Sequence, residues 1–177
     1  MNVSRENKFI YLGIPRTGSR WTFRSLSQYG LVGIEPRLDA LTHKVGIPEG
    51  CEDYLVIATI RHPLTRMASC WRWVSQNWEN WGGAGIAAHE SFESFVRYVA
   101  EGRTAIQSQN TELGEIKPDV LLRFETLPED IASLPFVSES PTGFNGGGSD
   151  PYTAETKALV AKLWSDDLER FDYQTPS

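Results

Sequence analysis

The sequence predicts an α/β fold built on a parallel sheet, and three apolar runs of strand length carry this prediction. The runs cover residues 8–14, 54–60 and 119–124. Each is apolar along most of its length, which is typical of strands that are buried on both faces. Segments with helical periodicity follow them, and strands that alternate with helices favour a parallel sheet. We therefore expect a three-layer α/β/α arrangement around a central parallel sheet.

The boundaries of the helices follow from turn signals. Segment 19–29 carries apolar residues at helical intervals and stops at Gly30, and Pro63 occupies the favoured first position of a helix through Trp81. The glycine-rich stretch 82–85 is expected to break that helix. A further short strand is expected at 31–35, and further helices at 91–101 and 153–171.

Length and composition favour a single domain that spans residues 1–177. Of the 177 residues, 40% are hydrophobic and 23% are charged, a balance with which one domain buries its own core. The formal net charge of −6 argues against a general nucleic-acid binder, which needs a basic surface. The first residues do not resemble a signal peptide, so we expect a cytoplasmic protein without membrane association. The three histidines and two cysteines are scattered, and we expect no metal site.

A glycine-bearing loop after the first strand predicts an anion site. Gly13 and Gly18 have the spacing of the first half of the Walker phosphate-binding pattern, and a helix is expected from Ser19. Backbone N–H groups and the positive end of the helix dipole then converge on one point. The pattern would continue with Lys followed by Ser or Thr, whereas this chain has Ser19 and Arg20. We therefore expect phosphate binding, but not by a magnesium-dependent NTPase.

The junction after the second strand offers side chains for a second phosphate. Arg61 stands at the end of strand 54–60, and Ser69 lies two turns into the helix that follows. A guanidinium presents a planar fork of N–H donors, and a serine adds a hydroxyl. The carboxyl ends of neighbouring parallel strands open into one crevice. We therefore expect both junctions to face one ligand.

Together, the two junctions resemble the donor site of the sulfotransferases that use 3′-phosphoadenosine 5′-phosphosulfate (PAPS). The stretch 15–21, Pro-Arg-Thr-Gly-Ser-Arg-Trp, looks like their 5′-phosphosulfate loop. The stretch 61–69 is similar to their 3′-phosphate motif, with its arginine and serine at the family spacing. Segments 122–127 and 163–173 also resemble family elements, so the likeness covers most of the chain. It implies the P-loop NTPase-like sulfotransferase fold.

The resemblance implies a role for each matched residue. Backbone amides of residues 17–20 would hold the 5′-phosphosulfate, and Arg61 and Ser69 would hold the 3′-phosphate. Trp21 would stack on adenine and Phe124 would be a second neighbour of that ring, with plain core packing as the alternative for both. The implied donor-binding residues are Pro15, Arg16, Thr17, Gly18, Ser19, Arg20, Trp21, Arg61, Ser69 and Phe124.

Two residues are candidates for the transfer step. Arg16 stands where most cytosolic-type members carry lysine and carbohydrate-type members carry arginine, and its charge would stabilise the bridging oxygen as the sulfuryl group leaves. His43 is similar in placement to the family's catalytic histidine and would accept the acceptor's proton. The alternative for His43 is an exposed loop residue, with Glu125 as the competing base. Arg20 replaces a small hydroxyl residue and either contacts phosphate or points to solvent.

The expected reaction moves a sulfuryl group from PAPS to a hydroxyl or amine of a carbohydrate or small-molecule acceptor. It releases 3′,5′-ADP (PAP) and needs no metal. A P-loop kinase and a catalytically inactive nucleotide-binding module are the alternatives. Trp78 and Trp81 are candidates for acceptor contact, with core packing as the alternative. So short a chain either presents its acceptor openly or relies on the second subunit of a homodimer. The Gly146–Gly148 run either closes over the nucleotide or forms a plain surface loop.

Overall fold

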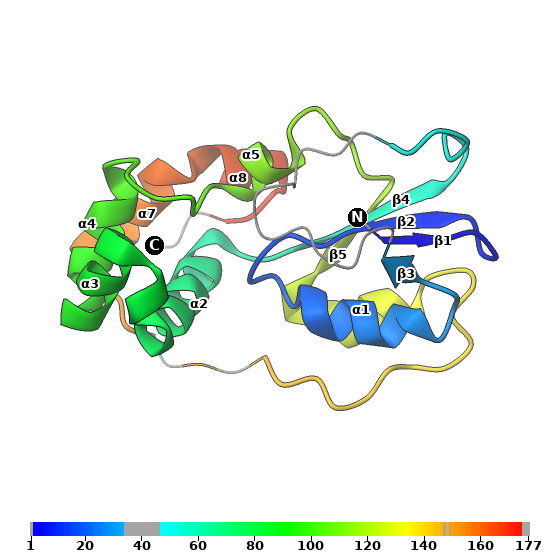
Figure 1. Ribbon diagram of the computed structural model, residues 1–177, viewed down its shortest axis with the longest axis horizontal. Helices are drawn as coiled ribbons and strands as arrows, with labels where there is room; N and C mark the ends of the chain where they lie inside the picture. The colour runs from blue at the N-terminus through cyan, green and yellow to red at the C-terminus, as the bar shows by residue number, and fades with distance from the viewer. Residues whose placement is uncertain (1, 34–46, 147, 149, 175–177) are drawn as a thin grey trace. The chain divides into compact units, whose positions relative to one another are not determined.

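A computed structural model describes residues 2–33, 47–146, 148 and 150–174 (Figure 1). His43 lies outside these residues. The chain divides into two compact units. One, which we call the sheet unit, comprises Met1–Arg61 and Glu112–Gly146, and the other, the helical unit, comprises His62–Thr111 and Gly147–Ser177.

The sheet unit contains a mixed sheet of five strands in the order β3-β1-β2-β4-β5. Strands β2, β4 and β5 are parallel, with Ile10 opposite Val56 and Ala58 opposite Leu121, which confirms the parallel centre. β1 is antiparallel to both β2 and β3. The strands are β1 (Asn2–Ser4), β2 (Phe9–Leu12), β3 (Val32–Gly33), β4 (Leu55–Ile60) and β5 (Val120–Arg123). The sequence did not predict β1, because three residues with one apolar side chain give no strand signal.

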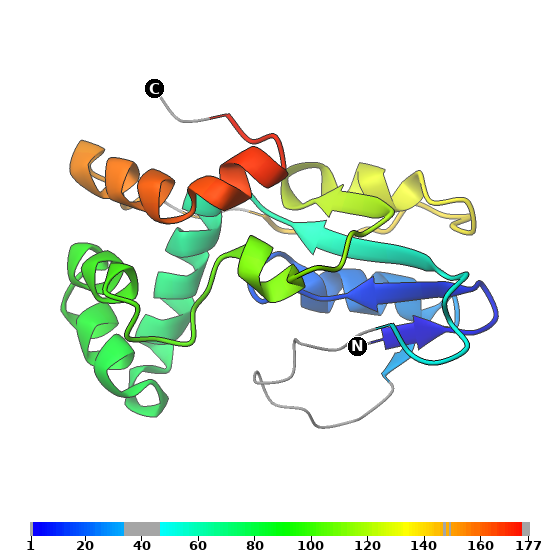
Figure 2. The ribbon, with the colours of Figure 1, turned by 90° about the horizontal axis from the view of Figure 1, so that it is seen from above.

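Two helices cover one face of this sheet: α1 (Ser19–Ser27) and α6 (Leu127–Ala132), seen in Figures 1 and 2. A short 3-10 turn, η2 (Phe124–Thr126), joins β5 to α6. The core beneath the helices is apolar, and each large buried side chain contributes about 1.5–3 kcal/mol relative to exposure. Its fully buried members include Phe9, Tyr11, Leu26, Ile57, Leu122, Leu127 and Ile131.

A second apolar cluster lies on the other face of the same strands. It contains Ile10 of β2 and Val56 of β4, and Cys51 and Tyr54 from the turn before β4 pack against them. Phe9 and Tyr11 belong to the first cluster whereas Ile10 belongs to the second, as the two-residue period of a strand requires. Burial on both faces explains why β2 and β4 read as nearly continuous apolar runs.

The helical unit is built around one apolar core formed by α2, α3, α4 and α7. Its fully buried centre includes Met67, Phe95, Val96 and Val160. The elements of this part of the chain are α2 (Pro63–Gln76), η1 (Trp78–Asn80), α3 (Gly82–Glu90), α4 (Phe92–Ala100), α5 (Gln109–Leu113), α7 (Ala154–Leu163) and α8 (Ser165–Arg170). None of the helices among the described residues is both long and apolar enough to cross a membrane.

The helix expected to reach Trp81 ends at Gln76 instead. Asn77 leaves the helical conformation at φ −128° and ψ 28°, and its side-chain amide donates to the carbonyl of Trp73 at 2.8 Å. Trp78 and Trp81 therefore lie beyond α2 and do not share a helical face with its tryptophans. Trp81 packs edge-on against Trp73, with ring centroids 5.0 Å apart.

The glycine-rich stretch 82–85 does not simply break a helix, because it begins α3. A Cβ on Gly85 would collide with the backbone carbonyl of Trp78, and one on Gly83 would collide with the ring of Tyr98. The lack of side chains allows these close approaches, and packing outweighs the roughly 1 kcal/mol that each helical glycine costs relative to alanine.

The last predicted helix, 153–171, is divided into α7 and α8 at Trp164. That residue is buried and adopts φ −115° and ψ 37°. Beyond the division, the buried Asp167 carboxylate accepts from the backbone N–H groups of Gln109 and Asn110 at 2.9 and 2.7 Å, at the start of α5. These contacts are tertiary, and the helical period of the sequence does not reveal them.

Candidate anion-binding site

The loop between β2 and α1 places two residues in the left-handed region of φ. Gly18 has φ 88°, and Arg16, which carries a side chain, has φ 68°. Between them, Thr17 is fully buried, and its hydroxyl donates to the carbonyl of Ile14 at 2.9 Å. Alternation of left-handed and other conformations is the backbone pattern of anion-binding nests.

Carbonyl groups of this loop accept hydrogen bonds from inside the sheet unit. The carbonyl of Arg16 accepts from a guanidinium nitrogen of Arg61 at 3.3 Å. The carbonyl of Gly18 accepts from the N–H groups of Trp21 and Thr22 at 2.9 and 3.0 Å. In a trans peptide the N–H points opposite to the C=O. The N–H groups of residues 17 and 19 therefore point away from these donors.

The amino end of α1 favours an anion. Gly18 is its N-cap residue, and among the described residues no side chain caps it. The N–H groups of Ser19 and Arg20 precede the first intrahelical bond, which Trp21 makes. The first turn contains no acidic residue. The positive end of the helix dipole and these N–H groups are the features on which the predicted anion site depends.

Gly18 also allows α1 to begin close to η2 and the start of α6, which follow β5. A Cβ at this position would lie 3.0 Å from Leu127 Cδ2 and 3.1 Å from Phe124 Cδ2. The left-handed φ of 88° would strain any other residue as well. The glycine of the predicted motif is therefore required by the fold of the loop, independently of any ligand.

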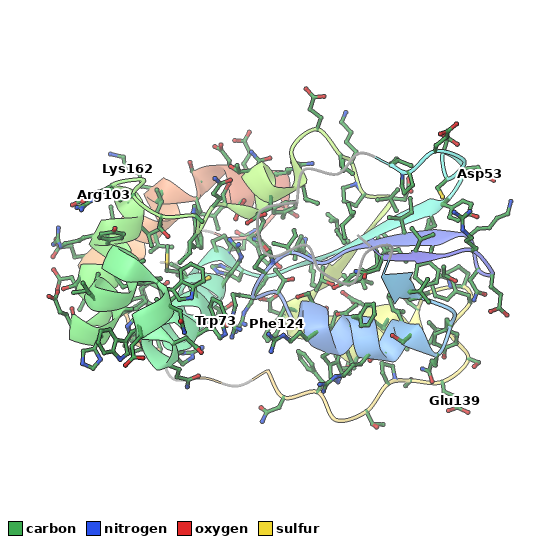
Figure 3. All side chains as sticks on the ribbon, in the orientation of Figure 1. Asp53, Trp73, Arg103, Phe124, Glu139 and Lys162 are labelled. Carbon is green, nitrogen blue, oxygen red and sulfur yellow. The ribbon has the colours of Figure 1, made fainter. Side chains whose placement is uncertain are left out.

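Arg61 and Phe124, both predicted donor-binding residues, form one contact in the sheet unit. The Arg61 guanidinium carbon lies 3.6 Å from the centroid of the Phe124 ring, and the side chain is only 6% exposed. Figure 3 labels Phe124 beside the amino-terminal end of α1. A buried cation–π contact of this kind contributes about 1–2 kcal/mol. It holds the guanidinium next to the loop whose Arg16 carbonyl it binds.

A third aromatic ring, Phe144, joins the two predicted adenine neighbours. Its ring centroid lies 4.8 Å from that of Trp21 and 5.1 Å from that of Phe124. A Cβ on Gly146 would lie 3.1 Å from Phe144 and 3.3 Å from Phe124. Phe144 was not predicted from the sequence, although an aromatic residue two positions before a glycine run could have indicated it. Gly146 therefore packs on aromatic rings in the sheet unit.

The remaining predicted site residues differ in exposure, and they belong to both units. Pro15, Arg16 and Ser19 are partly exposed in or beside the loop, and Arg20 and Glu125 are exposed. Ser69 belongs to the helical unit, where it is buried in α2. Its pairing with Arg61 of the sheet unit stays a prediction.

The amino end of α2 differs from that of α1, because the side chain of His62 caps it. His62 Nδ1 accepts from the N–H of Leu64 at 3.2 Å, and Pro63 at the first helical position has no N–H. The other ring nitrogen of His62 bonds to the carbonyl of Gln174 at 3.2 Å. An anion near this helix would therefore be held by side chains rather than by helix amides.

Among residues 2–33, 47–146, 148 and 150–174, no group of three or more His, Cys, Asp or Glu side chains is arranged to hold a metal ion. The cations of the candidate site are arginines: Arg16 in the loop, Arg61 beside it and Arg20 in the first turn of α1. Comparison with protein-family models, curated proteins and solved structures finds no match.

Proposed function

We propose that this protein is a PAPS-dependent sulfotransferase with a P-loop NTPase-like, three-layer α/β/α fold. One observation supports the proposal most directly. The amino end of α1 is not capped by a described side chain, and carbonyl groups of the loop before it accept hydrogen bonds from within the sheet unit. Amides so arranged favour a phosphate or phosphosulfate group. Serine and arginine at positions 19 and 20 replace the lysine and hydroxyl residue that a magnesium-dependent NTPase requires.

The donor is proposed to bind along the loop. Amides of residues 17–20 hold the 5′-phosphosulfate, and the cluster of Trp21, Phe124 and Phe144 receives the adenine ring. Arg61 holds the 3′-phosphate together with Ser69. A guanidinium presents its N–H donors in a planar fork, a geometry that suits a phosphate.

The proposed reaction is an in-line transfer. The bond between sulfur and the bridging oxygen of PAPS breaks, and a bond forms between sulfur and the acceptor's oxygen or nitrogen. The acceptor's proton passes to His43, and Arg16 neutralises the negative charge on the bridging oxygen of the departing PAP. The acceptor is a hydroxyl or amine of a carbohydrate or small molecule, presented openly or enclosed by a second copy of the chain.

Calorimetric titration tests the choice of nucleotide. We expect 3′,5′-ADP to bind more tightly than ATP with magnesium, and Arg16→Ala to weaken that binding about tenfold, as loss of one charged hydrogen bond does. Arg24→Ala, which removes an exposed arginine from the last turn of the same helix, is the matched control. Tighter binding of ATP with magnesium would favour the kinase alternative and overturn the proposal.

Turnover separates an enzyme from an inactive binding module. With radiolabelled PAPS and a panel of hydroxyl and amine acceptors, we expect transfer that His43→Ala slows about 10²- to 10⁴-fold, the usual contribution of a general base. Binding of 3′,5′-ADP without transfer to any acceptor would instead support the inactive module. His43→Ala should leave the affinity for 3′,5′-ADP unchanged.

A further inference from the structure

Three buried hydroxyl groups form a chain beneath the anion loop. The phenol oxygen of Tyr11 in β2 lies 2.8 Å from Oγ1 of Thr59 in β4, and that Oγ1 lies 3.4 Å from Oγ1 of Thr22 in α1. The Thr22 hydroxyl in turn lies 3.3 Å from the carbonyl oxygen of Gly18. All three side chains are fully buried. The chain thus runs from the sheet through the core to the N-cap residue of α1.

Counting protons fixes the direction of this chain. Thr22 gives its one hydroxyl proton to the Gly18 carbonyl, because a carbonyl can only accept. Thr22 then accepts from Thr59, whose proton is used in that bond. Thr59 therefore accepts from Tyr11, which is the donor at 2.8 Å. Every O–H bond points toward the Gly18 carbonyl.

The direction of these hydrogen bonds affects the N–H on the opposite side of the peptide group between Gly18 and Ser19. The peptide between Gly18 and Ser19 carries a carbonyl that accepts from Thr22 Oγ1 and from the N–H groups of Trp21 and Thr22. Aligned hydrogen bonds polarise one another, and a peptide whose carbonyl is strongly bonded is a better donor at its N–H. The N–H of Ser19 points away from the groups that donate to this carbonyl. The buried chain thus strengthens and orients one donor of the anion site.

We propose that Tyr11 and Thr59 are positioning residues of the anion loop, acting through Thr22 on the Gly18–Ser19 peptide. The inference rests on the proposed function in that the anion is taken to be the 5′-phosphate group of the donor. Simple core packing would not require hydroxyls here. Phenylalanine and valine would fill the same volumes, whereas each buried hydroxyl costs desolvation that its hydrogen bonds only offset.

Burial also keeps the first donor of the chain protonated. It raises the pKa of the Tyr11 phenol to about 12. The phenol therefore donates throughout the physiological range. The distances of 3.4 Å between the two threonine hydroxyls and 3.3 Å from Thr22 Oγ1 to the Gly18 carbonyl are long for O–H···O hydrogen bonds. The effect of each link on affinity should accordingly be modest, about two- to tenfold.

A pair of substitutions at Thr59 isolates the hydroxyl. Thr59→Val keeps the volume and removes the donor, whereas Thr59→Ser retains the hydroxyl. Calorimetry of each variant compares 3′,5′-ADP with 3′-AMP, which lacks the 5′-phosphate. We expect Thr59→Val to weaken 3′,5′-ADP about two- to tenfold relative to 3′-AMP, Tyr11→Phe to act in the same direction, and Thr59→Ser to restore the ratio. Equal weakening of both nucleotides, or failure of Thr59→Ser to restore the ratio, would overturn the inference.

A second measurement separates this inference from the proposed function. If the wild-type protein binds neither nucleotide, the proposed function fails, and inorganic sulfate becomes the probe. Its effect on the Ser19 amide resonance is followed by nuclear magnetic resonance. A sulfate response of Ser19 in the wild type that weakens in Thr59→Val and returns in Thr59→Ser supports the positioning role. Absence of a response in the wild type, or an equal response in all three proteins, overturns it.

Discussion

The amino ends of α1 and α2 follow parallel strands, yet they are built in opposite ways. α1 begins at Gly18, in the left-handed conformation, without a cap from any described side chain. α2 begins with an imidazole cap from His62 and with Pro63, which has no N–H to offer. Among the described residues, no side chain caps the first helix end, whereas His62 caps the second. This difference explains why an anion is expected at α1.

The support beneath each helix end differs as well. Under α1, polar groups of the core are directed at the loop: the Thr17 hydroxyl, the Arg61 guanidinium and the hydroxyl chain from Tyr11 all end on loop carbonyls. At α2, by contrast, His62 bonds the helix itself and the carbonyl of Gln174. Three predictions test this difference, in order of decreasing effect.

Gly18→Ala should have the largest effect. The new Cβ would meet Leu127 and Phe124 at about the distances of hard contact, and a left-handed alanine is strained, so we expect a loss of about 2–4 kcal/mol in the free energy of unfolding and loss of 3′,5′-ADP binding. Denaturant unfolding and calorimetry measure the two effects.

Gly143→Ala is the matched control for Gly18→Ala. Gly143 has a similar φ of 77°, and a Cβ added there would meet no described atom within 4 Å beyond its chain neighbours, so only the conformational cost of roughly 1–2 kcal/mol applies. Nucleotide binding should be unchanged in this variant. If both variants lose the same stability and Gly18→Ala still binds nucleotide, then the close packing of Gly18 does not maintain the anion loop.

Tyr11→Phe should alter the dependence of stability on alkaline pH. Burial raises the pKa of Tyr11 to about 12, whereas the unfolded chain releases this proton near the ordinary value of 10. The stabilisation is therefore complete below about pH 10 and is lost as pH rises toward 12, by about 2–3 kcal/mol. In Tyr11→Phe, this contribution to the loss of stability at alkaline pH should disappear.

Tyr152→Phe provides the comparison for Tyr11→Phe in the helical unit. Burial also raises the pKa of Tyr152, whose hydroxyl donates to the carbonyl of Leu64 at 2.8 Å. Removal of the Tyr152 hydroxyl should likewise lessen the loss of stability at alkaline pH, but it should not change the ratio of affinities for 3′,5′-ADP and 3′-AMP. An unchanged alkaline profile of Tyr11→Phe would show that the phenol is not buried as described.

His62→Ala should have the smallest effect. Loss of the cap of α2 should lower the free energy of unfolding by about 0.5–2 kcal/mol, and His62→Asn, which can cap through its side-chain oxygen, should recover most of it. Neither change should move the response of Ser19 to anions. A variant without the cap that is as stable as the wild type would contradict the capping role of His62.

Local patterns of the sequence were sufficient for the centre of the sheet and for the loop. Apolar runs predicted β2, β4 and β5, and β2 and β4 are buried on both faces. The spacing of Gly13 and Gly18 predicted the loop before α1, where Gly18 has a left-handed φ that few other residues tolerate. The general arrangement is therefore α/β, with a sheet whose parallel part was expected and whose antiparallel edge was not.

The features that the sequence did not reveal depend on contacts between distant residues. Gly85 is tolerated in the first turn of α3 because its lack of a side chain lets it pack on the carbonyl of Trp78. Phe144 joins the site because it meets two rings from other elements. The hydroxyl chain is of the same kind, since Tyr11 and Thr59 are 48 residues apart and read as ordinary strand residues. No local period or motif encodes these contacts.

The most direct test of the central claim is a titration of isotope-labelled protein with 3′,5′-ADP, followed through its backbone amide resonances. The amides of Thr17, Ser19 and Arg20 should shift as they donate to the 5′-phosphate, whereas the amide of Leu64, which already donates to His62, should not. Shifts at Leu64 without shifts at residues 17–20 would contradict the assignment of the anion to the amino end of α1.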